Sequence, residues 1–197
     1  MNLLRRTACT LALACAITGT AGAQDTGKWF DIGISQEVTV PSDDGLAWEY
    51  FPPYPFGETY PPGTLVYARM YPVACEVIPQ LYLECETRRF VNAYVGFFND
   101  GGCGCGGYLF KPVTLRIPYD EAVVAGHGVP ETQLGVIHYN WDALAWETVP
   151  AVRVLPEANA VEFEFAGWIL AEHYYVVVAG TPTPVEPATW GRIKALW

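Results

Sequence analysis

The stretch VTLRIPY, Val113–Tyr119, decides the fold that we expect for this chain. Large apolar or aromatic residues fill every second position, with threonine, arginine and proline between them. Period two places the apolar set on one face of an extended strand and the polar set on the other. The stretch VEFEF, Val161–Phe165, repeats the pattern with glutamates on the polar face. Both stretches therefore predict half-buried β-strands.

Further segments share this β-branched and aromatic composition, and turn signals rich in glycine, proline and asparagine separate them. The additional predicted strands are Thr64–Met70, Leu81–Thr87, Val91–Phe98, Gln133–Tyr139 and Tyr174–Ala179. No stretch of about 12 residues shows the periodicity of an amphipathic helix. We predict an all-β protein, an antiparallel sandwich of immunoglobulin-like type.

The first 23 residues have the organisation of a secretory signal peptide. Arg5 and Arg6 precede the apolar run Thr7–Ile17, and Ala21-Gly22-Ala23 fits an A-x-A cleavage site. The run is shorter than the roughly 20 residues that span a bilayer. We expect export by the general or the twin-arginine route, and a secreted, periplasmic or envelope location. A lipid anchor on Cys15 is a less favoured alternative.

Charge limits the partners of the mature chain. Removing Arg5 and Arg6 from 11 basic residues leaves 9 against 21 acidic ones, a net charge of −12. Such a surface repels phosphate backbones, so we expect no nucleic acid partner. We also expect no membrane span in the mature chain and no cofactor. An unknown protein or a glycan remains as the partner.

Composition divides the rest of the chain. Residues 24–62 include the run EYFPPYPFGETYPPG, and we expect an irregular arm rich in proline and aromatic residues, with room for one edge strand. Residues 63–180 form the predicted sandwich domain. Residues 181–197 form a linker and a tail. The tail resembles short W-G-x-I-K-x-L endings of exported bacterial proteins, which implies sorting or envelope attachment; a frayed end or a short docking helix is the alternative.

Four cysteines remain after the signal, and an even number in an exported protein favours disulfides. They are Cys75, Cys85, Cys103 and Cys105. We favour bridges from the glycine loop DGGCGCGG, residues 100–107, to the pair Cys75 and Cys85. A direct Cys75–Cys85 bridge is the second possibility. A four-thiolate zinc site is the third, although the spacing lacks C-x2-C pairs; we predict no metal.

Aromatic side chains crowd the arm and raise the possibility of a carbohydrate platform. They are Trp48, Tyr50, Phe51, Tyr54, Phe56 and Tyr60. Planar rings can stack on sugars, but aromatic residues more often bury large areas in a core. We favour burial against the sandwich and keep carbohydrate binding as the alternative.

The chain offers no convincing catalytic constellation. Only Ser35 and Ser42 follow the signal, and neither lies in a nucleophile elbow. We expect each of the histidines, His127, His138 and His173, to stand alone, with His127 in solvent and the others as hydrogen-bonded fillers within strands. The glutamate pairs, Glu84 with Glu86 and Glu162 with Glu164, each lie on one polar strand face. We therefore predict no enzyme, with a hydrolase as the least favoured alternative.

Several motifs in order resemble the ZU5-like β-sandwich domains of bacterial extracellular proteins. They are FKPVTLRIPYDEA (Phe110–Ala122), the strand Leu134–Tyr139 with Asn140-Trp141-Asp142, Trp146–Pro150, and Asn159–Phe163. The resemblance covers Tyr108–Ala179 and implies a sandwich with an assembly or display role. Where that family's last strand opens H-F-S, this chain has His173-Tyr174-Tyr175, so the resemblance gives no support for self-cleavage.

Overall fold

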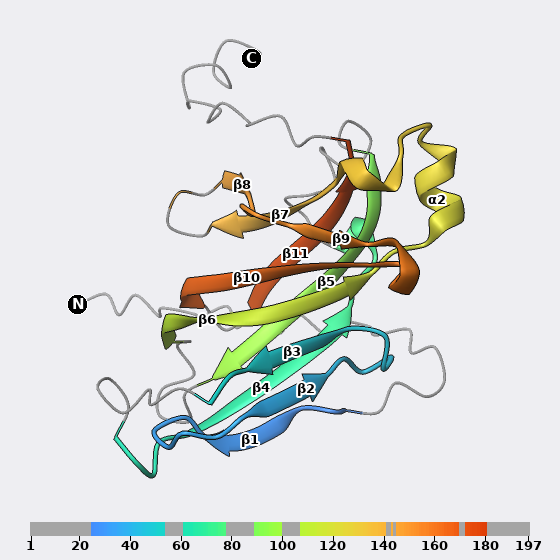
Figure 1. Cartoon of the computed structure of the whole chain (residues 1–197). Coiled ribbons are helices and arrows are strands. Elements are labelled where there is room, and N and C mark those ends of the chain that lie inside the picture. The colour runs from blue at the N-terminus through green and yellow to red at the C-terminus, as the bar shows by residue number, and fades with distance from the viewer. Residues whose placement is uncertain are drawn as a thin grey trace, which may run out of the picture.

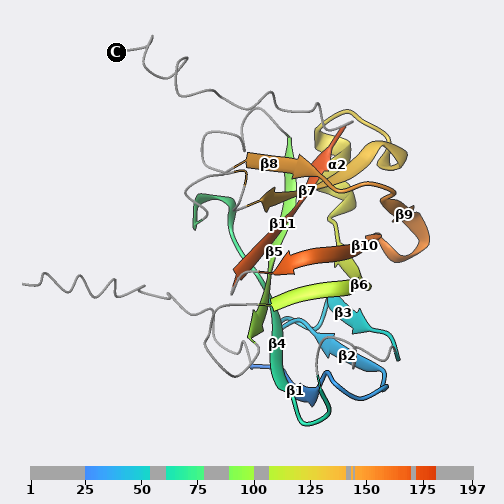
Figure 2. The ribbon, with the colours of Figure 1, turned by 90° about the vertical axis from the view of Figure 1, so that its left-hand side faces the viewer.

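The computed structural model describes residues 25–53, 61–77, 89–99, 107–140, 143, 145–169 and 172–180. These residues form a six-stranded sheet, with strand order β1-β4-β5-β11-β7-β8, and a five-stranded sheet, with order β2-β3-β6-β10-β9. The strands β6 and β10 cross over β5 and β11 in Figure 1 and lie beside them in Figure 2, so the sheets are stacked layers. The prediction of an all-β antiparallel sandwich is confirmed.

The strands follow one another with few helical turns. They are β1 (Lys28–Asp31), β2 (Val38–Pro41), β3 (Trp48–Phe51), β4 (Leu65–Pro72), β5 (Phe90–Asn99), β6 (Gly107–Pro118), β7 (Leu134–Asn140), β8 (Ala145–Thr148), β9 (Arg153–Leu155), β10 (Ala160–Ile169) and β11 (Glu172–Ala179). The helical turns are η2 (Cys75–Val77), α2 (Glu121–Gly126), η3 (Glu131–Gln133) and η4 (Pro156–Ala158).

The strand that decided the fold is β6, at the centre of the five-stranded sheet. Val113, Leu115 and Ile117 are fully buried, and the residues between them are half-exposed. β10 pairs with it antiparallel, and its own buried face continues the layer through Val161 and Phe163. Period two in the sequence thus placed both strands correctly, because one face of each strand packs on the opposite sheet.

The six-stranded sheet is apolar on both faces. Its inner face meets the other sheet through residues such as Met70, Tyr94 and Val177. A second cluster of buried side chains lies on its outer face, and includes Ala93, Ile137, Tyr139, Trp146, Val176 and Val178. This is why β5, β7 and β11 read in the sequence as nearly continuous apolar runs instead of alternating ones.

The predicted arm differs from the structure in one respect. Residues 25–53 contribute three strands: β1 at the edge of one sheet, and β2 with β3 in the other. Their alternation is confined to four residues each, so prolines and turn residues around them obscured it. The most proline-rich part of the arm, residues 54–60, lies outside the described residues, as does the predicted strand Leu81–Thr87.

The short helix α2 was not predicted, because six residues are too few to show helical periodicity. The Asp120 side chain accepts a hydrogen bond from the Ala122 backbone N–H and caps its start. No helix in the described part of the chain is long and apolar enough to cross a membrane.

Candidate functional site

The described aromatic residues of the arm do not share one surface. Phe51 is buried, 4.9 Å from Phe30 between ring centroids. Trp48 and Tyr50 point to the opposite face of β3, where the Arg116 guanidinium lies 5.0 Å from the Trp48 ring. The Tyr50 hydroxyl donates a hydrogen bond to Glu37 at 3.2 Å. The predicted burial is thus found for Phe51; Tyr54, Phe56 and Tyr60 lie outside the described residues.

Of the four cysteines that follow the signal, the structure describes only Cys75. It lies in η2, directly after the six-stranded sheet's β4, and it is disulfide-bonded. Cys85, Cys103 and Cys105 lie outside the described residues. The connectivity therefore stays a prediction.

Two histidines that stand apart in the sequence are neighbours in space, so the expectation that each stands alone is wrong. His138 on β7 and His173 on β11 lie with Nδ1 and Nε2 3.1 Å apart, and their rings stack at an interplanar angle of 18°. The antiparallel pairing of β7 with β11 causes this, since it aligns His138 with Tyr175, two residues beyond His173. Long-range register of this kind leaves no local sequence signal.

The histidine pair runs from the surface into the core. The half-exposed Glu147 carboxylate lies 3.5 Å from His138 Nε2. If His138 donates from Nε2, its Nδ1 accepts the hydrogen bond from His173, whose own Nδ1 is then an acceptor. That Nδ1 is buried and has no hydrogen-bond partner among the described residues. Burial, with a smaller effect of His138, lowers the pKa of His173 to about 3.

A carboxyl group lies inside the sandwich close to the same place. Glu49 on β3 is 3% exposed, and it points toward Gly96 on β5 across the core. A Cβ atom at Gly96 would come 3.2 Å from both the Glu49 Oε1 and the Tyr175 ring, so a larger residue there would require these side chains to shift. Burial raises the pKa of Glu49 to about 8. Glu49 is therefore a neutral acid at pH 7.

Tyr175 completes this buried polar cluster, which we define as Glu49, His138, His173 and Tyr175. The Tyr175 hydroxyl is buried without a hydrogen-bond partner among the described residues. Burial, with a smaller effect of the Glu49 charge, raises the pKa of Tyr175 well above its usual value. Phe165 from β10 packs on the Tyr175 and His173 rings, 5.7 and 4.6 Å away. Glu49, His173 and Tyr175 are buried between the two sheets, whereas His138 is partly exposed.

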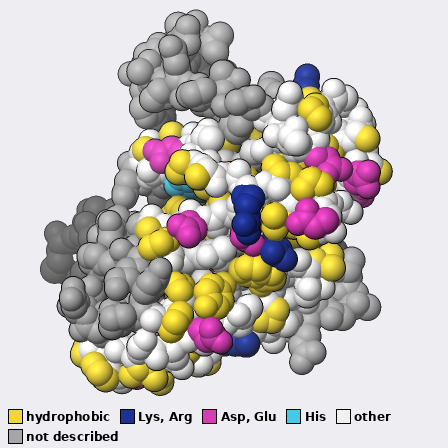
Figure 3. All heavy atoms as spheres, viewed as in Figure 1, with side chains coloured by type: hydrophobic (Ala, Val, Ile, Leu, Met, Phe, Trp, Pro, Cys, Tyr) yellow, Lys and Arg dark blue, Asp and Glu magenta, His cyan; other side chains and the backbone are white. Residues whose placement is uncertain are grey.

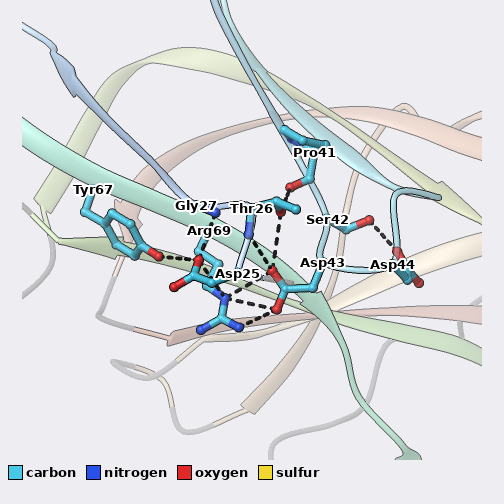
Figure 4. A network of polar contacts seen from close by, with 9 residues as sticks. All are labelled: Asp25, Thr26, Gly27, Pro41, Ser42, Asp43, Asp44, Tyr67 and Arg69. Atoms are coloured by element: carbon cyan, nitrogen blue, oxygen red, sulfur yellow. Dashed lines mark hydrogen bonds and ion pairs between the residues drawn. The ribbon is translucent and has the colours of Figure 1, made fainter. Parts of the chain in front are cut away.

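A second polar network anchors the start of the described chain (Figure 4). Thr26 donates from its hydroxyl to the Pro41 carbonyl at 2.6 Å and from its backbone N–H to Asp43 at 3.2 Å. Arg69 on β4 forms an ion pair with Asp43, whose side chain is almost fully buried. Asp43 thereby links β4, through Arg69, and the segment before β1, through Thr26, to the turn after β2.

The serine and glutamate candidates serve structural contacts. Ser42 is buried, and its hydroxyl exchanges hydrogen bonds with Ala47 backbone groups in the β2–β3 turn. Glu162 forms ion pairs with Arg116 and Arg153 across the five-stranded sheet, while Glu164 is exposed. Glu84 and Glu86 lie outside the described residues. His127 is half-exposed, with Nε2 2.9 Å from the Phe90 carbonyl.

One exposed aromatic row was missed in the sequence. Trp29, Tyr67 and Phe97 lie side by side on the outer face of β1, β4 and β5, with ring centroids 5.3 and 6.0 Å apart. Trp29 is 60% exposed. In Leu65–Tyr71 the even-numbered residues are buried, so the odd-numbered ones, Tyr67 among them, face outward. This alternation was a weak sequence signal for the exposed row.

The described residues contain no group of three or more His, Cys, Asp or Glu side chains placed to hold a metal ion. No protein-family model, curated protein or solved structure matches this chain. The ZU5-like resemblance therefore stays a prediction, and function has to be argued from the geometry.

Proposed function

We propose that this protein is an exported, non-catalytic β-sandwich module that binds or displays a partner at the cell envelope or outside the cell. The ZU5-like motif order and the apparent signal peptide support this role. The proposal further assigns the four cysteines to disulfides that tie the glycine loop to the sheet, in keeping with the bonded state of Cys75.

The observation that carries the proposal is where the reactive side chains lie. The groups with the largest pKa changes usually mark active sites, but here Glu49 and His173 are each 3% exposed. A substrate would have to separate the two sheets to reach them. Ser42 is fully buried and its hydroxyl is engaged in the β2–β3 turn, while Glu162, which is nearer the surface, is engaged in ion pairs.

The intact mass of the exported protein tests this proposal. We expect the mass of residues 24–197 less four hydrogens, and no alkylation before reduction. Four alkylated thiols in a zinc-containing sample would contradict the disulfide assignment. Retention of residues 1–23 would contradict export with cleavage.

A hydrolase assay tests the non-catalytic part. Purified protein incubated with oligosaccharide, ester and peptide substrates should release no product. Product release that disappears in Glu162→Gln or Glu84→Gln would show that the protein is an enzyme.

A further inference from the structure

The aromatic row combines exposure with a fixed geometry, which is unusual for surface aromatic residues. Trp29 pairs with Tyr67 across β1 and β4, and Phe97 lies diagonal to Tyr67 because Arg69 is its partner on β4. Six or fewer ångströms separate successive ring centroids. The three rings form a row across three paired strands, with interplanar angles of 46° between Trp29 and Tyr67 and 65° between Tyr67 and Phe97.

The middle ring of the row is held in place from two sides. Tyr67 lies across Gly27, where a Cβ atom would come 2.1 Å from the Tyr67 hydroxyl oxygen. The hydroxyl donates a 2.7 Å hydrogen bond to Asp25 Oδ1. Burial and the Asp25 contact raise the pKa of Tyr67 to about 12, so the hydroxyl stays a donor at every physiological pH. A ligand would meet a ring that needs no reordering.

Polar groups with unused hydrogen-bonding capacity lie beside the row. Gly27, Tyr67 and Arg69 all contact Asp25 through Oδ1, and no described residue donates to Oδ2 (Figure 4). The Asp25 side chain is 58% exposed. Arg69 uses Nε and Nη2 on Asp43, and no described residue accepts from Nη1. One acceptor and one donor group therefore remain next to the rings.

We propose that this face, defined as Trp29, Tyr67, Phe97, Asp25 and Arg69, is a binding site for an uncharged oligosaccharide. A pyranose ring has an apolar C–H face, which can stack on aromatic side chains, and hydroxyl groups at its rim. Adjacent hydroxyls need both an acceptor and a donor, and Asp25 Oδ2 and Arg69 Nη1 supply one of each. The site deepens the binding role proposed above and rests on it.

Charge favours a neutral sugar over other ligands. Among the described residues that define this face, the one cation, Arg69, is already paired with Asp43, and Asp25 adds a further negative charge. Phosphorylated or acidic ligands would be repelled by the carboxylates. This site differs from the arm aromatics, since Phe51 is buried and Trp48 faces Arg116.

Isothermal titration calorimetry with cellohexaose, chitohexaose and mannohexaose tests the proposal on the mature protein. We expect at least one of these probes to bind. Trp29→Ala should weaken that binding about tenfold or more, as truncation of a central aromatic contact does. Asp25→Ala should weaken it by a smaller factor. Leu46→Ala, which removes a 65% exposed side chain in the β2–β3 turn, should leave it unchanged.

Three results would overturn the proposal. The first is that none of the probes binds at millimolar concentration, and the second is equal binding by wild type and Trp29→Ala. The third is a dimer in light scattering that Trp29→Ala converts to a monomer, which would make the face a contact between two copies. Reducing ends released from a probe would instead contradict the non-catalytic function, while Trp29-dependent affinity would still support the site.

Discussion

Replacing Glu49 by glutamine should stabilise the folded protein at neutral pH. The Glu49 side chain lies in the core at 3% exposure, and burial raises its pKa to about 8. In the unfolded chain the carboxyl regains its ordinary pKa of 4.5. Folding at pH 7 therefore requires Glu49 to take up a proton, and the glutamine variant avoids that cost.

The magnitude follows from proton linkage. Because the folded-state pKa is the higher one, the stabilising contribution is complete below pH 4.5 and is lost as pH rises through 8. Each pH unit in this window costs about 1.4 kcal/mol for one proton. The wild type should thus lose about 3 kcal/mol relative to Glu49→Gln between pH 5 and pH 7. For a chain of this size that corresponds to roughly 6–12 °C in melting temperature.

Urea unfolding of both proteins at half-unit steps from pH 5 to pH 8 measures the difference directly. Taking the difference between the two proteins removes the contributions of all other groups that titrate equally in both. Carbon-13 NMR of labelled glutamate carboxyls reports the protonation of Glu49 independently. A stability difference that stays constant with pH, within about 0.5 kcal/mol, would mean that water reaches Glu49 and that this reasoning is wrong.

Three further predictions concern the same structure. Protonation of His173 is disfavoured in the fold, since burial lowers its pKa to about 3 against 6.5 unfolded; urea unfolding should therefore show the wild type losing about 2 kcal/mol relative to His173→Gln as pH drops from 7 to 5, whereas a difference that does not change with pH would contradict this. Gly96→Ala should cost about 1–3 kcal/mol, because its Cβ would press on Glu49 and Tyr175; a stability within 0.5 kcal/mol of wild type, measured by urea unfolding, would show that the core relaxes. Cys75→Ala should cost about 2–4 kcal/mol in the oxidised protein and nothing after reduction of the wild type; an equal loss under both conditions would exclude a disulfide effect.

Strands could be predicted from the sequence where buried and exposed residues alternate along the chain. In β6 and β10 the core touches only one face, and the period-two pattern stands out. The strands β1, β2 and β3 have only four residues each, too few for the alternation of apolar and polar residues to stand out. The neighbouring prolines suggested irregular structure there, although Val40 and Phe51 are fully buried.

The buried polar cluster could not be predicted, because its members come from three separate strands. Local patterning shows Glu49 as one polar residue between aromatic ones, which is typical of a solvent-facing position. Its neighbours Trp48 and Tyr50 instead take the outer face, and Glu49 takes the inner one. Only the pairing of β3 with β6, which aligns Glu49 with the buried Leu115, fixes this orientation. Register, not residue type, decided which side chain entered the core.

The side chains with strongly shifted pKa values and the exposed aromatic side chains lie on different faces of the six-stranded sheet. On the inner face, His173 and Tyr175 hold buried hydrogen-bonding atoms without partners in the described chain. On the outer face, Trp29 is open, and its neighbours Asp25 and Arg69 are engaged with Tyr67, Gly27 and Asp43 through hydrogen bonds and ion pairs. Catalysis needs a reactive group where a ligand can bind. In the described residues the strongly shifted groups and the exposed aromatic row lie on opposite faces, and this separation is the reason that we propose a binding role.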